Sequence, residues 1–125
     1  MSVTDVCFKE VALYNKDLGK EIGWRMCSGR AYYSMYHKTV KALSHYTYAG
    51  TGTHQDLIEY LKNDASRLEK KDAFGCKRVA YMLNQAKSER KLADYDIDKD
   101  FNESLAVASL KMVAKYSELI DDIFK

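Results

Sequence analysis

Apolar residues recur along this 125-residue chain at the spacing of amphipathic helices. The pattern predicts helices over about residues 4–20, 28–45, 53–68, 74–91 and 100–124. No segment shows the sustained alternation of apolar and polar residues that indicates a strand, and the chain contains no proline. We therefore expect one domain, residues 1–125, with an all-α fold: an up-and-down bundle of four to five helices.

Polar residues and glycines suggest where these helices begin and end. The expected caps are Thr4, Ser28, Thr53 with Asp56, and Asp100 with Glu103, while Gly19 and Gly23 are expected to end the first helix. Residues 69–72 read as a solvated connector, and residues 93–98 as a break in the helical pattern. The positions expected to face the core are Cys7, Val11, Tyr14 and Leu18; Tyr32, Met35, Tyr36, Thr39, Val40 and Leu43; Leu57, Leu61, Ala65 and Leu68; Val79, Leu83 and Ala86; and Leu105, Ala108, Met112, Tyr116, Leu119 and Ile123.

Composition narrows the functional classes. The net charge of +2 is too balanced to indicate a general nucleic-acid binder, so such a site would have to be a local patch. Three scattered cysteines form no C-x-x-C pair, which argues against a disulfide framework or a zinc site and favours a reducing cytoplasm. The N-terminus lacks the features of a signal peptide, and no apolar run reaches the ~18 residues of a membrane span.

Residues 30–37 carry the strongest chemical signal. Arg30 and His37 are seven residues apart, so in a helix both side chains leave the same face, with Ser34 between them. A fixed cation beside a group that exchanges protons near neutral pH suits phosphodiester chemistry. A polar stripe on an amphipathic helix is, however, more often simply its solvated face. We find no metal-ligand cluster, no phosphate-binding glycine loop and no hydrolase nucleophile elbow, and expect no metal or cofactor.

The same residues resemble a known family. Residues 30–37 read R-A-Y-Y-S-M-Y-H, and with Ala42 and Leu43 they are similar to the R-A-Y-Y-x-x-F-H-x-x-x-x-A-L signature of one branch of the HEPN superfamily (higher eukaryotes and prokaryotes nucleotide-binding). Residues 90–95, R-K-L-A-D-Y, resemble the R-x-x-A-D-Y element of that branch. Thr53-His54 and an alanine-rich final helix also agree in order.

This resemblance implies a helical bundle that commonly forms a homodimer and acts in RNA cleavage or nucleotide binding. Active members use an R-x(4–6)-H motif without metal, and Arg30 and His37 satisfy that pattern. In many cleaving members the motif lies in a later helix, where this chain has Arg90 and then Tyr95 in place of histidine.

Two functional interpretations follow. In the first, the chain is a metal-independent endoribonuclease of toxin–antitoxin or defence type, in which His37 removes the ribose 2′-hydroxyl proton and Arg30 holds the phosphate. The residues expected to contact the substrate are Ser34, Tyr33, Arg90, Asp94 and Tyr95. The second arginine–histidine face of a homodimer would supply the missing acid.

In the second interpretation, the chain is a non-catalytic HEPN module that binds a nucleotide or a protein partner, such as a nucleotidyltransferase or an antitoxin. An Arg30–Asp94 ion pair would then be structural, and Trp24, Tyr46 and Tyr48 would form either an exposed aromatic surface or the rim of the bundle. The basic cluster at residues 67–78 would either steer RNA or serve as a solvated connector.

Overall fold

The computed structural model describes residues 3–48, 50 and 52–125, and in these ranges the chain is helical without a strand. Its helices are α1 (Asp5–Asp17), α2 (Glu21–Ala42), α3 (Thr53–Asn63), α4 (Ala65–Glu69), α5 (Ala73–Tyr95) and α6 (Glu103–Ile123). The all-α prediction is confirmed, with six helices in the described ranges instead of four to five because the third predicted helix divides into α3 and the short α4.

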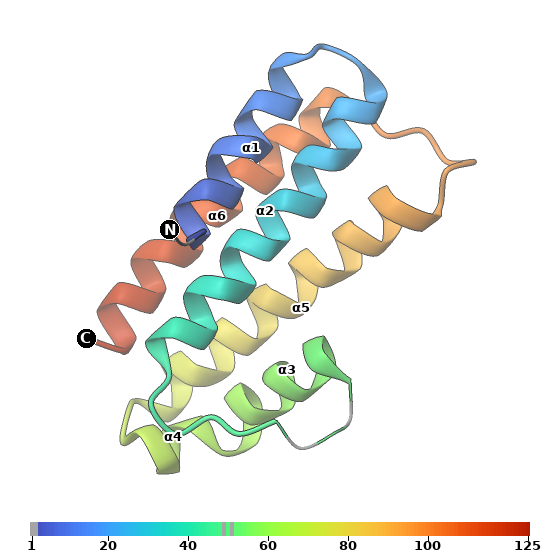
Figure 1. The fold of residues 1–125 in the computed structure, drawn as a ribbon. Helices are drawn as coiled ribbons and strands as arrows, with labels where there is room; N and C mark the ends of the chain where they lie inside the picture. Colours follow the sequence, from blue (N-terminus) through green and yellow to red (C-terminus); the bar gives the residue numbers. More distant parts are fainter. Residues whose placement is uncertain (1–2, 49, 51) are drawn as a thin grey trace.

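Four long helices, α1, α2, α5 and α6, run side by side with alternating direction, and α3 and α4 lie across one end of this group (Figure 1). α2 is the central helix, because it packs against α1, α5 and α6. α3 packs against α5, so it lies beside that helix at this end of the bundle. This arrangement brings the middle of α2, the start of α3 and the second half of α5 together.

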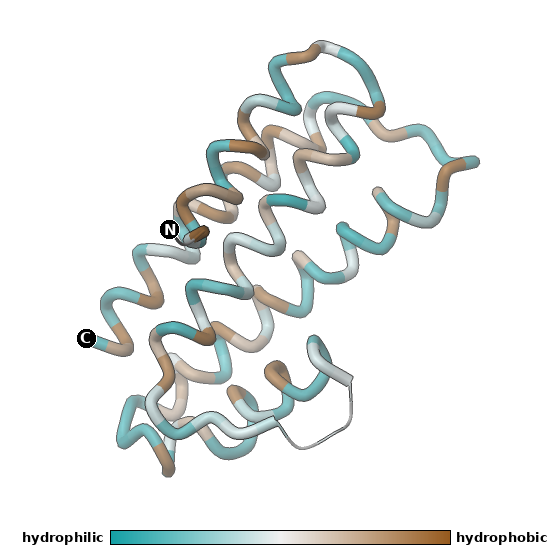
Figure 2. Tube along the Cα trace, in the orientation of Figure 1, coloured by the Kyte–Doolittle hydropathy of each residue, from teal (hydrophilic) through white to brown (hydrophobic). Residues whose placement is uncertain are grey.

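The predicted inner face of α1 is wrong. Val11, Tyr14 and Leu18 are 46%, 69% and 50% exposed, and the positions that are buried are Ala12 and Asn15. The reason is close packing: a Cβ atom built on Gly23 of α2 would lie 2.2 Å from the backbone oxygen of Asn15. The side of α1 that meets α2 therefore carries Ala12 and Asn15, and the larger apolar side chains lie on the outside. Figure 2 shows hydrophobic residues along α1.

The predicted boundaries of α2 also need correction. Gly19, with φ of +70°, does turn the chain, but α2 already begins at Glu21, so Gly23 and Ser28 lie inside it. Ser28 is buried and its hydroxyl lies 2.7 Å from the hydroxyl of Ser109 in α6, so it does not cap a helix.

At its other end α2 stops at Ala42, before the predicted His45. The side chain of Glu69 accepts hydrogen bonds from the backbone N–H groups of Ser44 and His45 and from the hydroxyl of Tyr60. Burial alone would raise the pKa of Glu69, but these hydrogen bonds outweigh it and hold the pKa below its usual range. Glu69 thus anchors the chain after α2 and is not part of a solvated connector.

Four further expectations about helix ends and faces are corrected. The cap of α6 is Asn102, which accepts a hydrogen bond from the N–H of Leu105, and not Asp100. The buried residues of α6 are Ala106, Ser109, Val113, Tyr116 and Ile120, so Tyr116 alone of the predicted seam is fully buried. α5 extends to Tyr95, beyond the predicted end at residue 91, and Leu68 is 38% exposed.

Candidate functional site

The aromatic ring of Tyr33 is the point at which two arginines meet. The guanidinium carbon of Arg30 lies 5.0 Å from the ring centroid, and that of Arg90 lies 5.6 Å from it. Nη1 of Arg90 also donates to the Tyr33 hydroxyl over 3.3 Å. The negative face and the oxygen of this one phenol orient both cations. No ion pair with another described residue neutralises Arg30.

Three elements supply this site. α2 carries Arg30, Tyr33 and His37 at positions i, i+3 and i+7, which places them along one strip of the helix. His54 lies in the first turn of α3, and Arg90 in the second half of α5. We call the following residues the Tyr33 cluster: Arg30, Tyr32, Tyr33, Tyr36, His37, His54 and Arg90.

The two histidines of the Tyr33 cluster approach the same tyrosines from different helices. The ring of Tyr36 lies 5.2 Å from that of His37 and 5.1 Å from that of His54. His37 is exposed and stacks on Phe8 of α1 at 4.9 Å, and it lines an open groove of about 580 Å³ between α1 and α2. A solvent-accessible imidazole and a partly buried one therefore share one surface.

His54 is held in one orientation by Tyr32. Its Nδ1 atom lies 2.8 Å from the Tyr32 hydroxyl, which has no other hydrogen-bond partner among the described residues. Burial raises the pKa of Tyr32, so this hydroxyl keeps its proton and donates it to Nδ1. The neutral His54 ring then carries its own proton on Nε2, where it is available as a hydrogen-bond donor.

The electrostatic environment favours this neutral form. Burial lowers the pKa of His54, and the positive charges of Arg90, Lys87, His37 and Lys91 lower it further. The same positive charges would attract an anion. His54 is therefore suited to donate to a phosphate oxygen and not to compete with the arginines as a third cation.

Both arginines retain an unused donor. The Nε atoms of Arg30 and Arg90 are buried and have no hydrogen-bond partner among the described residues. Arg90 is 8% exposed, and its ion pair with Asp94 spans 3.8 Å between Nη1 and Oδ2. Buried polar groups are nearly always paired, so these two nitrogens are exceptions among the described residues, together with Nδ2 of Asn15 and Nε1 of Trp24.

The structure brings most of the predicted site residues together. Tyr33 and Arg90 lie in the Tyr33 cluster with Arg30 and His37, and the ring of Tyr95 lies 5.8 Å from the Arg90 guanidinium carbon. Asp94 pairs with Arg90, so the expected Arg30–Asp94 ion pair is replaced by one within α5.

Ser34 does not belong to this site. Its side chain is buried, and its hydroxyl donates to the backbone oxygen of Asp5 over 2.8 Å. The reason is that α1 covers this side of α2, which the spacing within α2 alone does not reveal. Ser34 therefore ties α1 to α2 and is unavailable to a phosphate.

Sequence reasoning missed His54 and Lys87 as site residues. The Thr53-His54 pair was the available signal for His54, since it belongs to the family resemblance. Lys87 carried no signal, because its place beside His54 depends on the packing of α5 against α3. Of the three aromatic residues considered for a surface, Trp24 and Tyr46 are partly buried against the core and Tyr48 is 55% exposed.

Within the described part of the chain, no group of three or more His, Cys, Asp and Glu side chains is arranged to hold a metal ion. None of the described helices has the length and apolar character needed to cross a membrane.

Comparison with known proteins gives no further guide to this site. No family model matches the chain, no curated protein matches it, and no solved structure matches its fold.

Proposed function

We propose that this chain is an HEPN-like protein that binds RNA at the Tyr33 cluster and cleaves it without a metal ion. The observation that carries the proposal is the meeting of two arginines and two histidines around the ring of Tyr33. Two arginines can hold a phosphate by bidentate, charge-assisted hydrogen bonds. The HEPN resemblance supports the proposal, because its motifs place residues in or beside this cluster. These motifs lie in residues 30–37, at residue 54 and in residues 90–95.

The substrate class follows from the chemistry of the side chains. Histidine and arginine supply proton transfer and charge stabilisation, but neither is needed as a nucleophile when the substrate carries its own. RNA provides that nucleophile in the 2′-hydroxyl group, which DNA lacks. The Tyr33 cluster therefore fits RNA better than DNA.

The reaction is an internal transfer of the phosphate. Neutral His37 removes the 2′-hydroxyl proton, and the 2′-oxygen forms a bond to phosphorus. The phosphorus–O5′ bond then breaks, the 5′-oxygen takes a proton from the protonated His37 of the second copy in a homodimer, and the products are a 2′,3′-cyclic phosphate and a 5′-hydroxyl end. Arg30 and Arg90 stabilise the negative charge that grows on the non-bridging oxygens, and the Nε2–H of His54 donates to one of them.

The direct test is cleavage of a mixed RNA pool by purified protein in EDTA, beside a DNA pool of equal length. We expect RNA fragments that end in a 2′,3′-cyclic phosphate, and intact DNA, because only RNA carries the attacking hydroxyl. Cleavage that requires added metal, or equal cleavage of DNA, would contradict the mechanism. RNA binding without cleavage would instead favour the non-catalytic HEPN module.

We further propose that the chain forms a homodimer through the outer stripe of α1, which consists of Val11, Tyr14 and the C-cap residue Leu18. These side chains follow i, i+3 and i+7 spacing and are all largely exposed, an arrangement typical of a helix that packs on a partner. Dimerisation would bury them and place a second copy beside α1, whose Phe8 contacts His37.

Sedimentation measures this directly. The parent is expected at twice the 14.4 kDa chain mass, and Val11→Asp with Leu18→Asp is expected to shift it to a monomer, because two carboxylates cannot be buried unpaired. Val6→Asp with Leu13→Asp is the matched control, since these exposed residues lie on another side of α1. A monomeric parent, or the same shift in the control, would refute the interface.

A further inference from the structure

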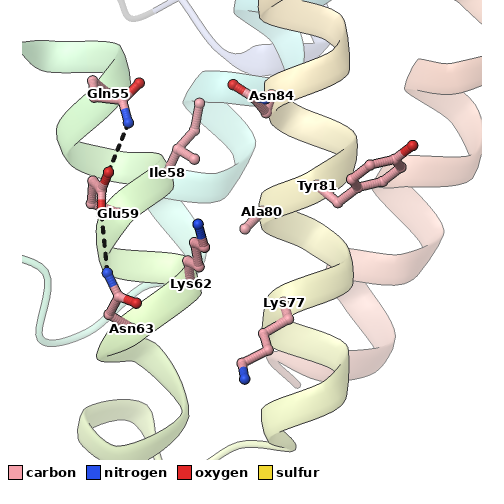
Figure 3. Close-up of a pocket in the computed structure, with 9 residues that line it drawn as sticks. All are labelled: Gln55, Ile58, Glu59, Lys62, Asn63, Lys77, Ala80, Tyr81 and Asn84. Atoms are coloured by element: carbon pink, nitrogen blue, oxygen red, sulfur yellow. Dashed lines mark hydrogen bonds between the residues drawn. The ribbon is translucent and has the colours of Figure 1, made fainter.

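We propose that the groove between α3 and α5 binds the RNA nucleotides adjacent to the cleaved phosphate, an inference that rests on the proposed function. The groove has a volume of about 530 Å³, within the range of small-molecule binding sites. Its floor is formed by Ile58 and Ala80, and its walls carry lysine and amide side chains (Figure 3). An apolar floor with polar walls can accept the flat face of a base and the hydrogen-bonding groups at its edge.

The charge of the groove favours a phosphate backbone. Its acidic lining residue, Glu59, accepts hydrogen bonds from Gln55 over 2.9 Å and from Asn63 over 3.0 Å, as drawn in Figure 3. Lys62 and Lys77, by contrast, form no ion pair with any described residue. Two free ammonium groups on opposite walls therefore face a carboxylate whose oxygens are already engaged.

The groove lies next to the Tyr33 cluster along α3 and α5. Gln55 directly follows His54 in α3, and its side-chain oxygen accepts a hydrogen bond from Nζ of Lys87 over 3.1 Å. Burial lowers the pKa of Lys87, and the nearby charges of Lys91 and Arg90 lower it further. Lys87, which contacts Gln55 of the groove, is therefore close to the charges of Lys91 and Arg90.

This neighbouring position gives the groove a specific role. In the proposed binding mode the scissile phosphate lies between Arg30 and Arg90, and the adjacent phosphates pass Lys87 and then Lys62 and Lys77. The amide of Asn84 points toward the gap between the helices and is available to a base edge (Figure 3). Tyr81 lies at the rim with its ring directed away from α3, so it has no part in this inference.

The test compares two non-cleavable probes, 2′-O-methyl octauridylate and the 2′-O-methyl dinucleotide UpU, by fluorescence anisotropy. For the Lys62→Ala, Lys77→Ala protein we expect about tenfold weaker binding of the octamer and less than about a twofold change for the dinucleotide. The slope of log affinity against log salt should fall by about 1.4 for the octamer, because each phosphate contact on a single strand contributes ~0.7.

The matched control is Lys111→Ala with Lys115→Ala, which removes the same charge from exposed positions on α6. If this control weakens octamer binding as much, or if the groove variant binds the octamer as the parent does, the groove does not hold the strand. That result leaves the proposed function intact provided that the parent binds the dinucleotide. If the parent binds neither probe, the proposed function itself fails, and the inference fails with it.

Discussion

Replacing Arg25 with alanine is expected to lower the free energy of unfolding by about 3–5 kcal/mol, the largest loss of stability that we expect from a single substitution in this chain. Arg25 is 5% exposed, and Nη1 donates to the backbone oxygens of Leu92, Ala93 and Asp96 over 3.2, 3.0 and 3.3 Å. Nη2 donates to the backbone oxygen of Lys99. The side chain thus caps the end of α5 and holds the chain that follows it.

The size of the effect follows from the groups left behind. Carbonyl groups at the end of a helix have no partner within the helix, and they carry the negative end of its dipole. Without the guanidinium group, the carbonyls of α5 lose their donor, and Phe101, whose ring lies 5.4 Å from the guanidinium carbon, loses a packing partner. Since domains of this kind are stable by only ~5–15 kcal/mol, the loss is a large fraction of the total.

Urea denaturation monitored by circular dichroism measures this effect. Arg67→Ala is the matched control, because Arg67 is exposed and its pair with Asp64 spans 3.3 Å within one turn, so its loss should cost less than about 1 kcal/mol. The free energy of unfolding of Arg25→Lys should be close to that of Arg25→Ala, because a single ammonium group cannot reach all of the carbonyls that the planar guanidinium group contacts. A loss at Arg25 no greater than that at Arg67 would contradict the structure.

The second large expected effect is on catalysis: His37→Ala should reduce the rate of RNA cleavage by about 10²–10⁴-fold. The side chain is exposed and stacks on Phe8, so its removal should leave the fold intact. The variant should therefore unfold at the same urea concentration as the parent while losing the base that accepts the 2′-hydroxyl proton.

Two measurements separate this catalytic role from a structural one. Added imidazole should restore part of the activity of His37→Ala, because the free base can occupy the space left at the exposed surface. His45→Ala is the matched control, since His45 is exposed and its backbone N–H, not its ring, is bound by Glu69. Equal loss in the control, or no response to imidazole together with an unchanged pH profile, would rule out His37 as the base.

Local sequence predicts the features that depend on periodicity. The helical class follows from apolar spacing, and Tyr32, Met35 and Thr39 of α2 are buried as that spacing predicts. Val79 and Leu83 of α5 are likewise fully buried. α2 and α5 are central helices with neighbours on several sides, so their apolar positions are buried on whichever side they lie.

The candidate site was predictable only in part. Arg30, Tyr33 and His37 share a strip of α2 because helical geometry alone puts them there. The other contacts join residues that are far apart in the chain: Arg90 and Tyr33 are 57 positions apart, and His54 and Tyr32 are 22 positions apart. No local pattern encodes the distance between such groups.

Tertiary packing decided the rest, and the physical reason is that periodicity shows which residues share a face but not which face meets a neighbour. Contact at Gly23 selects Ala12 and Asn15 as the inner face of α1 and leaves Val11, Tyr14 and Leu18 exposed. Arg25 is buried because it reaches backbone carbonyls up to 74 positions away. By itself, the sequence determined a helical chain with Arg30 and His37 on one face of α2. Arg90 and His54 lie beside them only because α5 packs against α2 and α3 packs against α5.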